Sequence, residues 1–296
     1  MTNNISLFVL GYKGLVVLKK LLEHNYEEAI EAVIVGEDRN VENDYSKEVT
    51  QLLEASNIQY FKRKADYKLK SKYWIAIGWR WLIQESPPSK LIVLHDSLLP
   101  KYRGFSPLVN QLINGEREVG VSAIFAVEEY DKGPILEQQS KKINYPIKIN
   151  TAIQLVSDLY AKVVLSLIKK ISLDKELIGK VQDEAKATYS LWRDELDYFI
   201  DWSSNSKKIS RTINALGFPY HGAKTYFNNK LVVINEAEVY PDLEIENRHC
   251  GKVVKIEQGK PVVVCKKGLL KITKAHDIES KTSILPLQKF RSRFHS

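Results

Sequence analysis

The fold is decided by residues 5–36, which read ISLFVLGYKGLVVLKKLLEHNYEEAIEAVIVG. Two short apolar runs, Ile5–Leu10 and Glu31–Gly36, are typical of buried strands. Between them, Gly14–His24 has the amphipathic spacing of a helix. A strand, a helix and a second buried strand in this order predict two parallel strands joined by a crossover helix.

The same alternation continues through the first half of the chain. Further strands are expected at Ile58–Phe61, Tyr73–Ile77, Leu91–Leu94 and Val119–Val127, and further helices at Ser46–Ala55 and along residues 152–171. The sequence therefore predicts an α/β fold with a Rossmann-like, mostly parallel sheet and helices on both faces. Ligands of such sheets bind beyond the carboxyl ends of the strands, so we expect the chemistry in those loops.

The last third of the chain has a different pattern. Ser203–Leu216 has the spacing of a helix, and alternating apolar runs follow it. These runs predict a smaller, OB-like C-terminal β-barrel. We expect a catalytic domain at residues 1–180, a polar linker at 181–200 and the barrel domain at 201–296.

The composition is that of an ordinary globular protein. Of the 296 residues, 44% are hydrophobic and 27% are charged, which argues against a disordered or fibrous chain. The apolar runs are far shorter than the roughly 20 residues of a membrane helix, and Met1–Phe8 lacks the basic start of an export signal. The two cysteines, Cys250 and Cys265, fit neither a disulfide framework nor a CxxC metal pair. We expect a cytoplasmic protein without membrane contact or a metal ion.

The net charge of +8 lies entirely in residues 201–296, because acidic and basic residues balance over residues 1–200. A basic second domain attracts phosphate-bearing partners, nucleic acid among them. The alternative is a solvated, lysine-rich surface without a partner. Both interpretations remain open at this point.

One turn and two loops carry candidate functional residues. The turn Gly11–Gly14 opens a helix, so its amides could face an anion with the help of Lys13; a plain strand-to-helix turn explains it equally well. His95 leaves the end of one predicted strand, and Asp131 lies in the loop after another. At the same edge of the sheet, these two side chains would form an acid–base pair, with the carboxylate orienting the imidazole. Alternatively, His95 is a semi-buried structural histidine and Asp131 a turn residue.

These segments resemble the formyltransferases that use 10-formyltetrahydrofolate. The family's His-x-Ser-Leu-Leu-Pro-x-x-Arg-Gly run, a Gly-Val-x-x-x strand and an Asp-x-Gly loop occur in order at His95–Gly104, Gly120–Ile124 and Asp131–Gly133. Residues 200–202 and 215–223 look like the second domain that methionyl-tRNA formyltransferases share with several amino-sugar N-formyltransferases. The resemblance covers nearly the whole chain and implies a formyltransferase with 10-formyltetrahydrofolate as co-substrate.

The resemblance also implies residue roles. It makes His95 the catalytic histidine and Asp131 its partner. The folate is expected at Gly78, Trp79, Arg80, Trp81, Leu82, Glu128 and Tyr130. Donors and stacking groups for a second, phosphate-bearing substrate are expected at Tyr12, Lys13, Ser97, Lys101, Tyr102 and Arg103. For Trp79 and Trp81, simple packing of the loop is an equal alternative.

One position departs from the family pattern. The family has asparagine two residues before the histidine, where its amide helps to hold the formyl oxygen, and this chain has Val93. Valine cannot donate a hydrogen bond, and loss of such a donor lowers the rate by about 100- to 1000-fold. The departure predicts a slow enzyme, a donor recruited from elsewhere such as Ser97 or Asn110, or a lost activity.

Three functions remain open. The first is formylation of a nucleotide-linked amino sugar, which is favoured because residues 37–44 are short and acidic where tRNA-binding relatives carry an inserted basic loop. The second is methionyl-tRNA formylation, with the basic C-terminal domain binding tRNA. The third is a silent protein that binds folate or sugar without turnover. Formation of a homodimer is left open as well.

Overall fold

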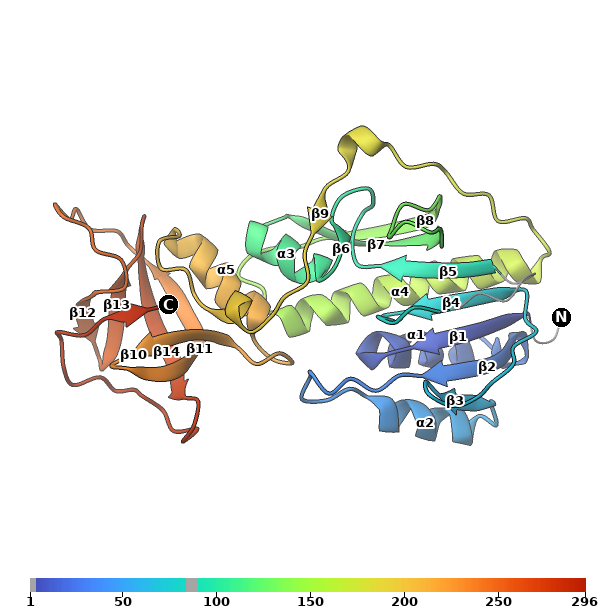
Figure 1. Cartoon of the computed structure of the whole chain (residues 1–296), viewed down its shortest axis with the longest axis horizontal. Coiled ribbons are helices and arrows are strands. Elements are labelled where there is room, and N and C mark those ends of the chain that lie inside the picture. Colours follow the sequence, from blue (N-terminus) through green and yellow to red (C-terminus); the bar gives the residue numbers. More distant parts are fainter. Residues whose placement is uncertain (1–3, 84–89) are drawn as a thin grey trace. The chain divides into compact units, whose positions relative to one another are not determined.

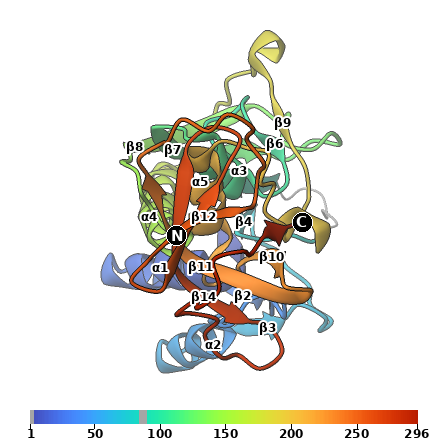
Figure 2. The ribbon, with the colours of Figure 1, turned by 90° about the vertical axis from the view of Figure 1, so that its left-hand side faces the viewer.

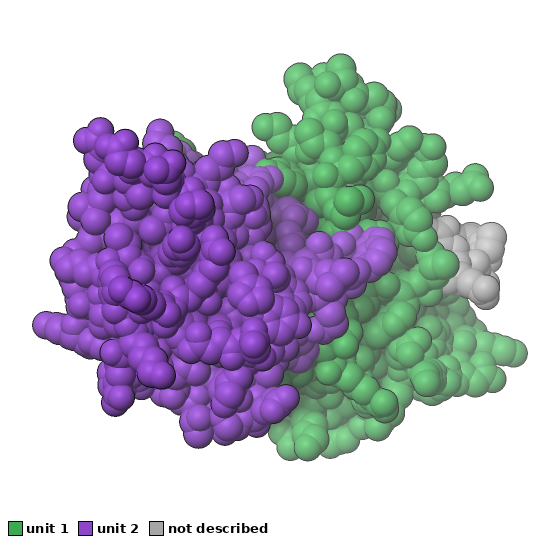
Figure 3. Space-filling view, turned by 60° about the vertical axis from the view of Figure 1, so that its left-hand side comes forward, with its two compact units in different colours: residues 1–108, 118–143, 151–191 green, residues 109–117, 144–150, 192–296 purple. Residues whose placement is uncertain are grey.

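The computed structural model describes residues 4–83 and 90–296, which form two compact units (Figure 1). The first unit contains the chain up to Leu108 together with Glu118–Ile143 and Thr151–Leu191, and the second contains Val109–Arg117, Asn144–Asn150 and Trp192–Ser296 (Figure 3). This division differs from the expected domains, because half of the expected linker belongs to the first unit. Gln182 and Ser190 in that segment are buried, and their side chains make hydrogen bonds within the first unit.

A seven-stranded sheet forms the centre of the first unit. Its strands are β1 (Ile5–Val9), β2 (Ile30–Val35), β3 (Tyr60–Lys62), β4 (Tyr73–Ile77), β5 (Lys90–His95), β7 (Glu118–Phe125) and β8 (Ile135–Lys142), and they lie in the order β3-β2-β1-β4-β5-β7-β8. The five strands from β3 to β5 pair in parallel, whereas β7 and β8 are antiparallel to their neighbours. All residues of β1 and β4 are buried, which explains why both strands are apolar apart from Ser6. The mostly parallel sheet predicted from the alternation is therefore confirmed.

The sequence pattern did not predict β8. This strand reads ILEQQSKK and lies at the edge of the sheet, where all of its residues are half-buried or exposed. A polar edge strand lacks the apolar alternation on which such a prediction depends. A separate two-stranded sheet pairs β6 (Arg103–Gly104) with β9 (Tyr189–Ser190).

The helices that flank the sheet are α1 (Gly11–Glu23), α2 (Ser46–Ala55) and α4 (Ile149–Ser172). α1 packs on both β1 and α2, and the ring of Tyr160 in α4 lies 5.3 Å from the ammonium of Lys13 in α1. By length and composition, α4 could cross a membrane; 56% of its most apolar window is nevertheless buried inside the protein, as in a core helix. Elsewhere on the sheet, Phe8, Ile34, Trp74, Ala76 and Leu91 form a buried cluster, which is covered by non-helical residues such as Tyr67, Leu69, Trp79 and Ile83.

The second unit contains α3 (Pro107–Asn114, apart from its first two residues), α5 (Ser206–Leu216) and a curled antiparallel sheet (Figure 2). The strands of this sheet are β10 (Ala223–Phe227), β11 (Lys230–Tyr240), β12 (Val253–Glu257), β13 (Lys260–Val264), β14 (Leu269–Asp277) and β15 (Phe294–His295), in the order β12-β13-β14-β11-β10-β15. An isolated bridge between Lys252 and Arg293 joins its two edges. The C-terminal β architecture expected from the alternating runs is therefore present as a curled, barrel-like sheet.

Candidate active site

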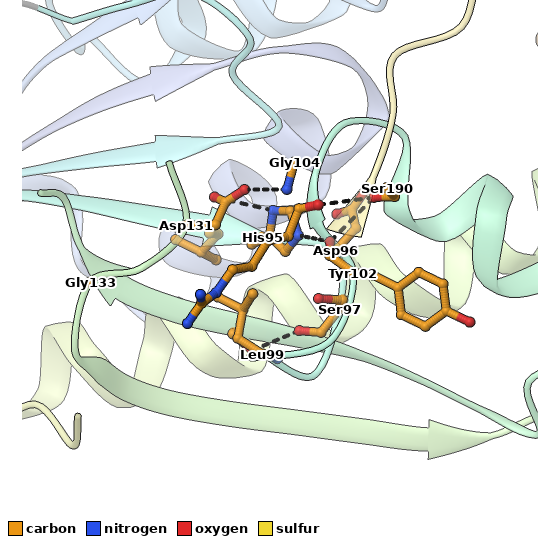
Figure 4. A network of polar contacts seen from close by, with 12 residues as sticks. His95, Asp96, Ser97, Leu99, Tyr102, Gly104, Asp131, Gly133 and Ser190 are labelled. Carbon is orange, nitrogen blue, oxygen red and sulfur yellow. Dashed lines mark hydrogen bonds and ion pairs between the residues drawn. The ribbon is translucent and has the colours of Figure 1, made fainter. Parts of the chain in front are cut away.

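The first unit brings His95 and Asp131 together (Figure 4). His95 is the last residue of β5, and Asp131 lies in the loop between β7 and β8. Nδ1 of His95 is 3.4 Å from Oδ1 of Asp131, and only 8% and 14% of the two side chains are exposed. Such burial strengthens their electrostatic interaction, because little water screens it.

The carboxylate of Asp131 is held by the backbone around it. Its Oδ2 accepts a hydrogen bond of 2.7 Å from the amide of Gly104. Asp131 itself has a left-handed backbone, with φ of 58°. A Cβ at Gly133 would lie 1.7 Å from the carbonyl oxygen of Phe125, so the Asp-x-Gly loop can turn here only with glycine. The loop is therefore built to present this one carboxylate.

The imidazole of His95 has an acceptor at each ring nitrogen. Nε2 lies 2.7 Å from the carbonyl oxygen of Tyr102, and Nδ1 faces Asp131. Because a carbonyl oxygen only accepts, this contact requires a hydrogen on Nε2. Tyr102 has a left-handed backbone, with φ of 60°. The loop after β5 thus turns back and fixes the ring orientation of its own histidine.

A second carboxylate lies beside the pair. Asp96 binds the ammonium of Lys13 and accepts a hydrogen bond of 2.6 Å from the hydroxyl of Tyr160. Burial raises the pKa of Asp96, but Lys13 and Tyr160 outweigh this effect, and the net pKa is lowered. Burial, assisted by Asp96, holds the pKa of Tyr160 well above its ordinary value. No spacing in the sequence predicts this cluster, and it gives Lys13 a partner in place of the expected substrate phosphate.

Arg103 also differs from its expected role. It is fully buried, with Nε and Nη2 bonded to Oε1 of Gln182 and with Nη1 and Nη2 bonded to the two carboxylate oxygens of Glu184. A guanidinium engaged in this way has little capacity left for a phosphate. In this structure Arg103 ties residues 182–184 to the loop after β5.

The other expected substrate residues differ in accessibility. Ser97 is fully buried and donates to the carbonyl oxygen of Lys101 at 2.6 Å, so its hydroxyl is not free to replace an amide. Lys101 is exposed, and Tyr12 is half-buried with its ring centroid 5.1 Å from that of Tyr45. Tyr102 is half-buried, and its backbone contacts His95.

The expected folate loop combines packed and exposed residues. Gly78 has φ of +64°, and the ring of Trp79 lies edge-on to Phe8 and to Trp81 at 5.4 and 5.0 Å. Arg80 pairs with Asp38 at 2.8 Å but remains 46% exposed, and Leu82 is 84% exposed. Packing therefore explains much of Trp79, whereas Arg80 and Leu82 are accessible.

The loop that carries Asp131 offers two further exposed residues. Glu128 is exposed, and Tyr130 is 67% exposed, with its ring centroid 6.4 Å from that of Phe105. Nε1 of Trp79 is buried and has no hydrogen-bond partner among the described residues. Of these groups, Glu128 and Tyr130 are accessible from solvent, whereas Nε1 of Trp79 is not.

Val93 is the residue at which the sequence resemblance implies an amide side chain. It is half-buried and packs against the cluster around Phe8 and Trp74. Alternation along β5 places Val93 on the same side of the strand as His95. Asn110, the other expected substitute, accepts a hydrogen bond of 2.6 Å from Arg193 within the second unit.

No group of three or more His, Cys, Asp or Glu side chains suited to a metal ion is present among residues 4–83 and 90–296. The arrangement at His95 is one of hydrogen-bond donors and acceptors, suited to moving a proton and to stabilising a developing oxyanion.

Comparison with known proteins agrees with this architecture. Residues 19–165 match the formyl transferase family, and residues 194–289 match the C-terminal domain of formyl transferase. The chain is 32% identical to the methionyl-tRNA formyltransferase of Kosmotoga olearia over 64% of this chain and 60% of that protein. The match thus spans less than two thirds of that relative.

Two solved structures show the same fold. An N-formyltransferase from Helicobacter canadensis, in complex with folinic acid and dTDP-3-aminofucose, has a TM-score of 0.71 at 17% identity, over 92% of this chain and 99% of that one. Methionyl-tRNA formyltransferase from Clostridium thermocellum has a TM-score of 0.56 at 18% identity, over 81% and 94%. The mostly parallel sheet of the first unit and the curled antiparallel sheet of the second are the architecture that these structures share. The chain belongs to the formyl transferase family.

Proposed function

We propose that this protein transfers the formyl group of 10-formyltetrahydrofolate to the primary amine of a nucleotide-linked amino sugar, with His95 and Asp131 as catalytic residues. The observation that carries the proposal is the contact between these side chains at the end of β5, in a chain of the formyl transferase family. No metal takes part in the proposed reaction.

The reaction requires one site both to stabilise a negative oxygen and to remove a proton from the amine nitrogen. The amine nitrogen attacks the formyl carbon, and the tetrahedral intermediate carries a negative oxygen while the nitrogen must lose a proton. In the proposed reaction, Nε2 of His95 exchanges the carbonyl oxygen of Tyr102 for the oxyanion and donates its hydrogen to it. Asp131 supports the imidazole through Nδ1 and accepts the proton of the amine, directly or through water. The C–N bond to the folate nitrogen then breaks, and that nitrogen takes up a proton.

The exposed residues of two loops are proposed to bind the folate. Arg80 and Leu82 come from the loop after β4, and Glu128 and Tyr130 come from the loop that carries Asp131. Since Val93 supplies no hydrogen, the oxyanion depends more heavily on His95 than it does where an asparagine is present. We therefore expect slow turnover.

The choice of a sugar over tRNA rests on the segment after β2. Residues 37–44 contain four acidic side chains and a single arginine, which disfavours contact with an RNA backbone. Asp38 and Asp44 take part in an internal network of hydrogen bonds, so these acids are fixed in place. The full-length fold match to an enzyme crystallised with dTDP-3-aminofucose supports the same choice.

Methionyl-tRNA formylation is the second candidate, favoured by the sequence matches. The deciding experiment incubates the full chain with 10-formyltetrahydrofolate and either a panel of dTDP- and UDP-linked amino sugars or charged initiator tRNA. The proposal expects formylation of at least one sugar and none of the tRNA. Formylation of the tRNA alone would establish the second candidate, and binding of folate without any transfer would establish a silent protein.

A further inference from the structure

Three basic residues of the C-terminal unit, Lys252, Arg291 and Arg293, lie along the seam where its curled sheet closes. Lys252 and Arg293 form an antiparallel bridge, the amide of Val253 donates to Ser292 O at 3.0 Å, and the amide of Phe294 donates to Gly251 O at 2.8 Å. Gly251 has φ of +82°, and a Cβ there would lie 1.9 Å from Phe294 O. The glycine therefore permits the close approach of the two edges.

A groove of about 560 Å³ lies along this seam, within the usual size range of small-ligand sites. The residues that line it include Asn228, Asn229, Lys252, Phe290, Arg291 and Arg293. All of these residues belong to the second unit, whereas His95 and Asp131 belong to the first.

The lining of the groove is cationic. Lys252, Arg291 and Arg293 are exposed, and no aspartate or glutamate is among the lining residues. Within residues 4–83 and 90–296, none of these three cations makes an ion pair with an acidic side chain. Lys252 and Arg293 lie directly opposite each other across the bridge, where like charges destabilise a strand pair. A bound anion would relieve that repulsion.

The groove also offers groups that suit a nucleoside. Phe290 is 54% exposed and presents an aromatic surface beside the arginines. Asn228 and Asn229 form the tight turn between β10 and β11, with φ of 50° and 61°, and both are exposed. Amides recognise the polar edge of a base, and aromatic rings stack on its face.

We propose that this groove binds a nucleoside diphosphate, with Lys252, Arg291 and Arg293 on the phosphates and Phe290 against the base. It is a second ligand site, on the C-terminal unit, and it requires no catalytic activity. Its occupancy tightens the seam of the sheet, because the anion bridges Lys252 and Arg293.

The test titrates UDP into the full chain by calorimetry and compares two double variants of equal charge. Lys252→Ser with Arg291→Ser removes two groove cations, and Lys207→Ser with Lys266→Ser removes two exposed lysines outside the groove. The groove variant should lose at least about tenfold in affinity for one UDP per chain, and the control should stay within twofold. Because only this unit is altered, a nucleotide bound near His95 would remain in both variants.

Two further titrations distinguish recognition of the nucleoside from binding of the phosphates alone. Phe290→Ala should weaken UDP but leave pyrophosphate unchanged, as expected for base stacking. The proposal is overturned if the groove variant binds UDP as wild type does, if pyrophosphate binds as tightly as UDP with no effect of Phe290→Ala, or if a short single-stranded RNA binds while UDP does not. Formyl transfer assayed in parallel reports separately on the function proposed for His95.

Discussion

The imidazole of His95 and the carboxylate of Asp131 face each other across the end of β5, with Nδ1 and Oδ1 3.4 Å apart. Two backbone groups hold the pair in place. The carbonyl oxygen of Tyr102 accepts from Nε2 of the imidazole, and the amide of Gly104 donates to Oδ2 of the carboxylate. The loop between His95 and Gly104 thus sets the geometry of both side chains.

Arg103 should hold residues 182–190 against the first unit. Replacing it with methionine in Arg103→Met removes the bonds to Gln182 and Glu184 and should lower the free energy of unfolding by about 1–3 kcal/mol. Amide hydrogens of residues 182–190 should exchange faster in this variant. Lys101→Met, which alters an exposed neighbour, is the control; unchanged exchange in Arg103→Met would contradict the assignment.

Asp96 should be important for stability. Asp96→Asn leaves Lys13 without its partner, and loss of one member of a buried ion pair costs about 3 kcal/mol. Urea unfolding monitored by tryptophan fluorescence measures the change. Asp183→Asn removes an exposed carboxylate paired with Lys186 and should leave the unfolding curve unchanged. Equal stability of Asp96→Asn and wild type would show that the cluster adds nothing.

The same carboxylate should make stability depend on pH. Because the pKa of Asp96 is lower in the folded protein than in the unfolded chain, the unfolded state takes up the proton first as the pH falls. The contribution of Asp96 is complete above the ordinary aspartate pKa of about 4 and is lost as the pH falls through the folded value. The free energy of unfolding should therefore fall less steeply below pH ~4 in Asp96→Asn than in wild type; parallel curves would exclude this role.

Val93 should limit the rate of formyl transfer. Val93→Asn restores an amide beside His95 and should raise kcat by about tenfold or more, since such donors contribute about 100- to 1000-fold elsewhere. The variant should also lose some stability, because Val93 packs on the aromatic cluster. Val93→Ala, which loses packing without gaining a donor, should not become faster. Fast formyl transfer by the wild type, with no increase of kcat in Val93→Asn, would contradict the importance of this position.

Much of the fold could be predicted from the sequence, because buried parallel strands leave continuous apolar runs. Ser46–Ala55 and Tyr73–Ile77 have the expected boundaries, and β1 and β2 differ by a residue or so at their ends. β8 lies at an exposed edge, and its polar sequence carries no such signal. The positions and antiparallel directions of β7 and β8 depend on strand pairings, which the pattern of apolar residues along the chain does not show.

The proximity of His95 and Asp131 was expected for a reason that is partly wrong. Two parallel strands would end at the same edge, but β7 is antiparallel to β5, with Phe125 opposite Ile92 and Ser122 opposite His95. The loop after β7 must therefore fold back toward the end of β5 to deliver Asp131. Glycine at 133 and the left-handed backbone of Asp131 make this turn possible.

Other parts of the site depend on contacts between distant segments. Lys13, Asp96 and Tyr160 come from α1, the loop after β5 and α4, and no spacing in the sequence joins them. Arg103 was expected to face a phosphate, but its partners Gln182 and Glu184 lie in a segment whose polar sequence resembles a linker. Burial of a polar side chain is decided by tertiary contacts, which the sequence alone does not show.

The most direct measurement of the central claim is transfer of an isotope-labelled formyl group from 10-formyltetrahydrofolate to a nucleotide-linked amino sugar by wild type, His95→Asn and Asp131→Asn. The wild type should form labelled product. Both variants should lose at least about 100-fold in rate while keeping the circular dichroism spectrum and the folate affinity of the wild type, and Asp183→Asn should react normally. Near-normal transfer by either His95→Asn or Asp131→Asn would contradict the account.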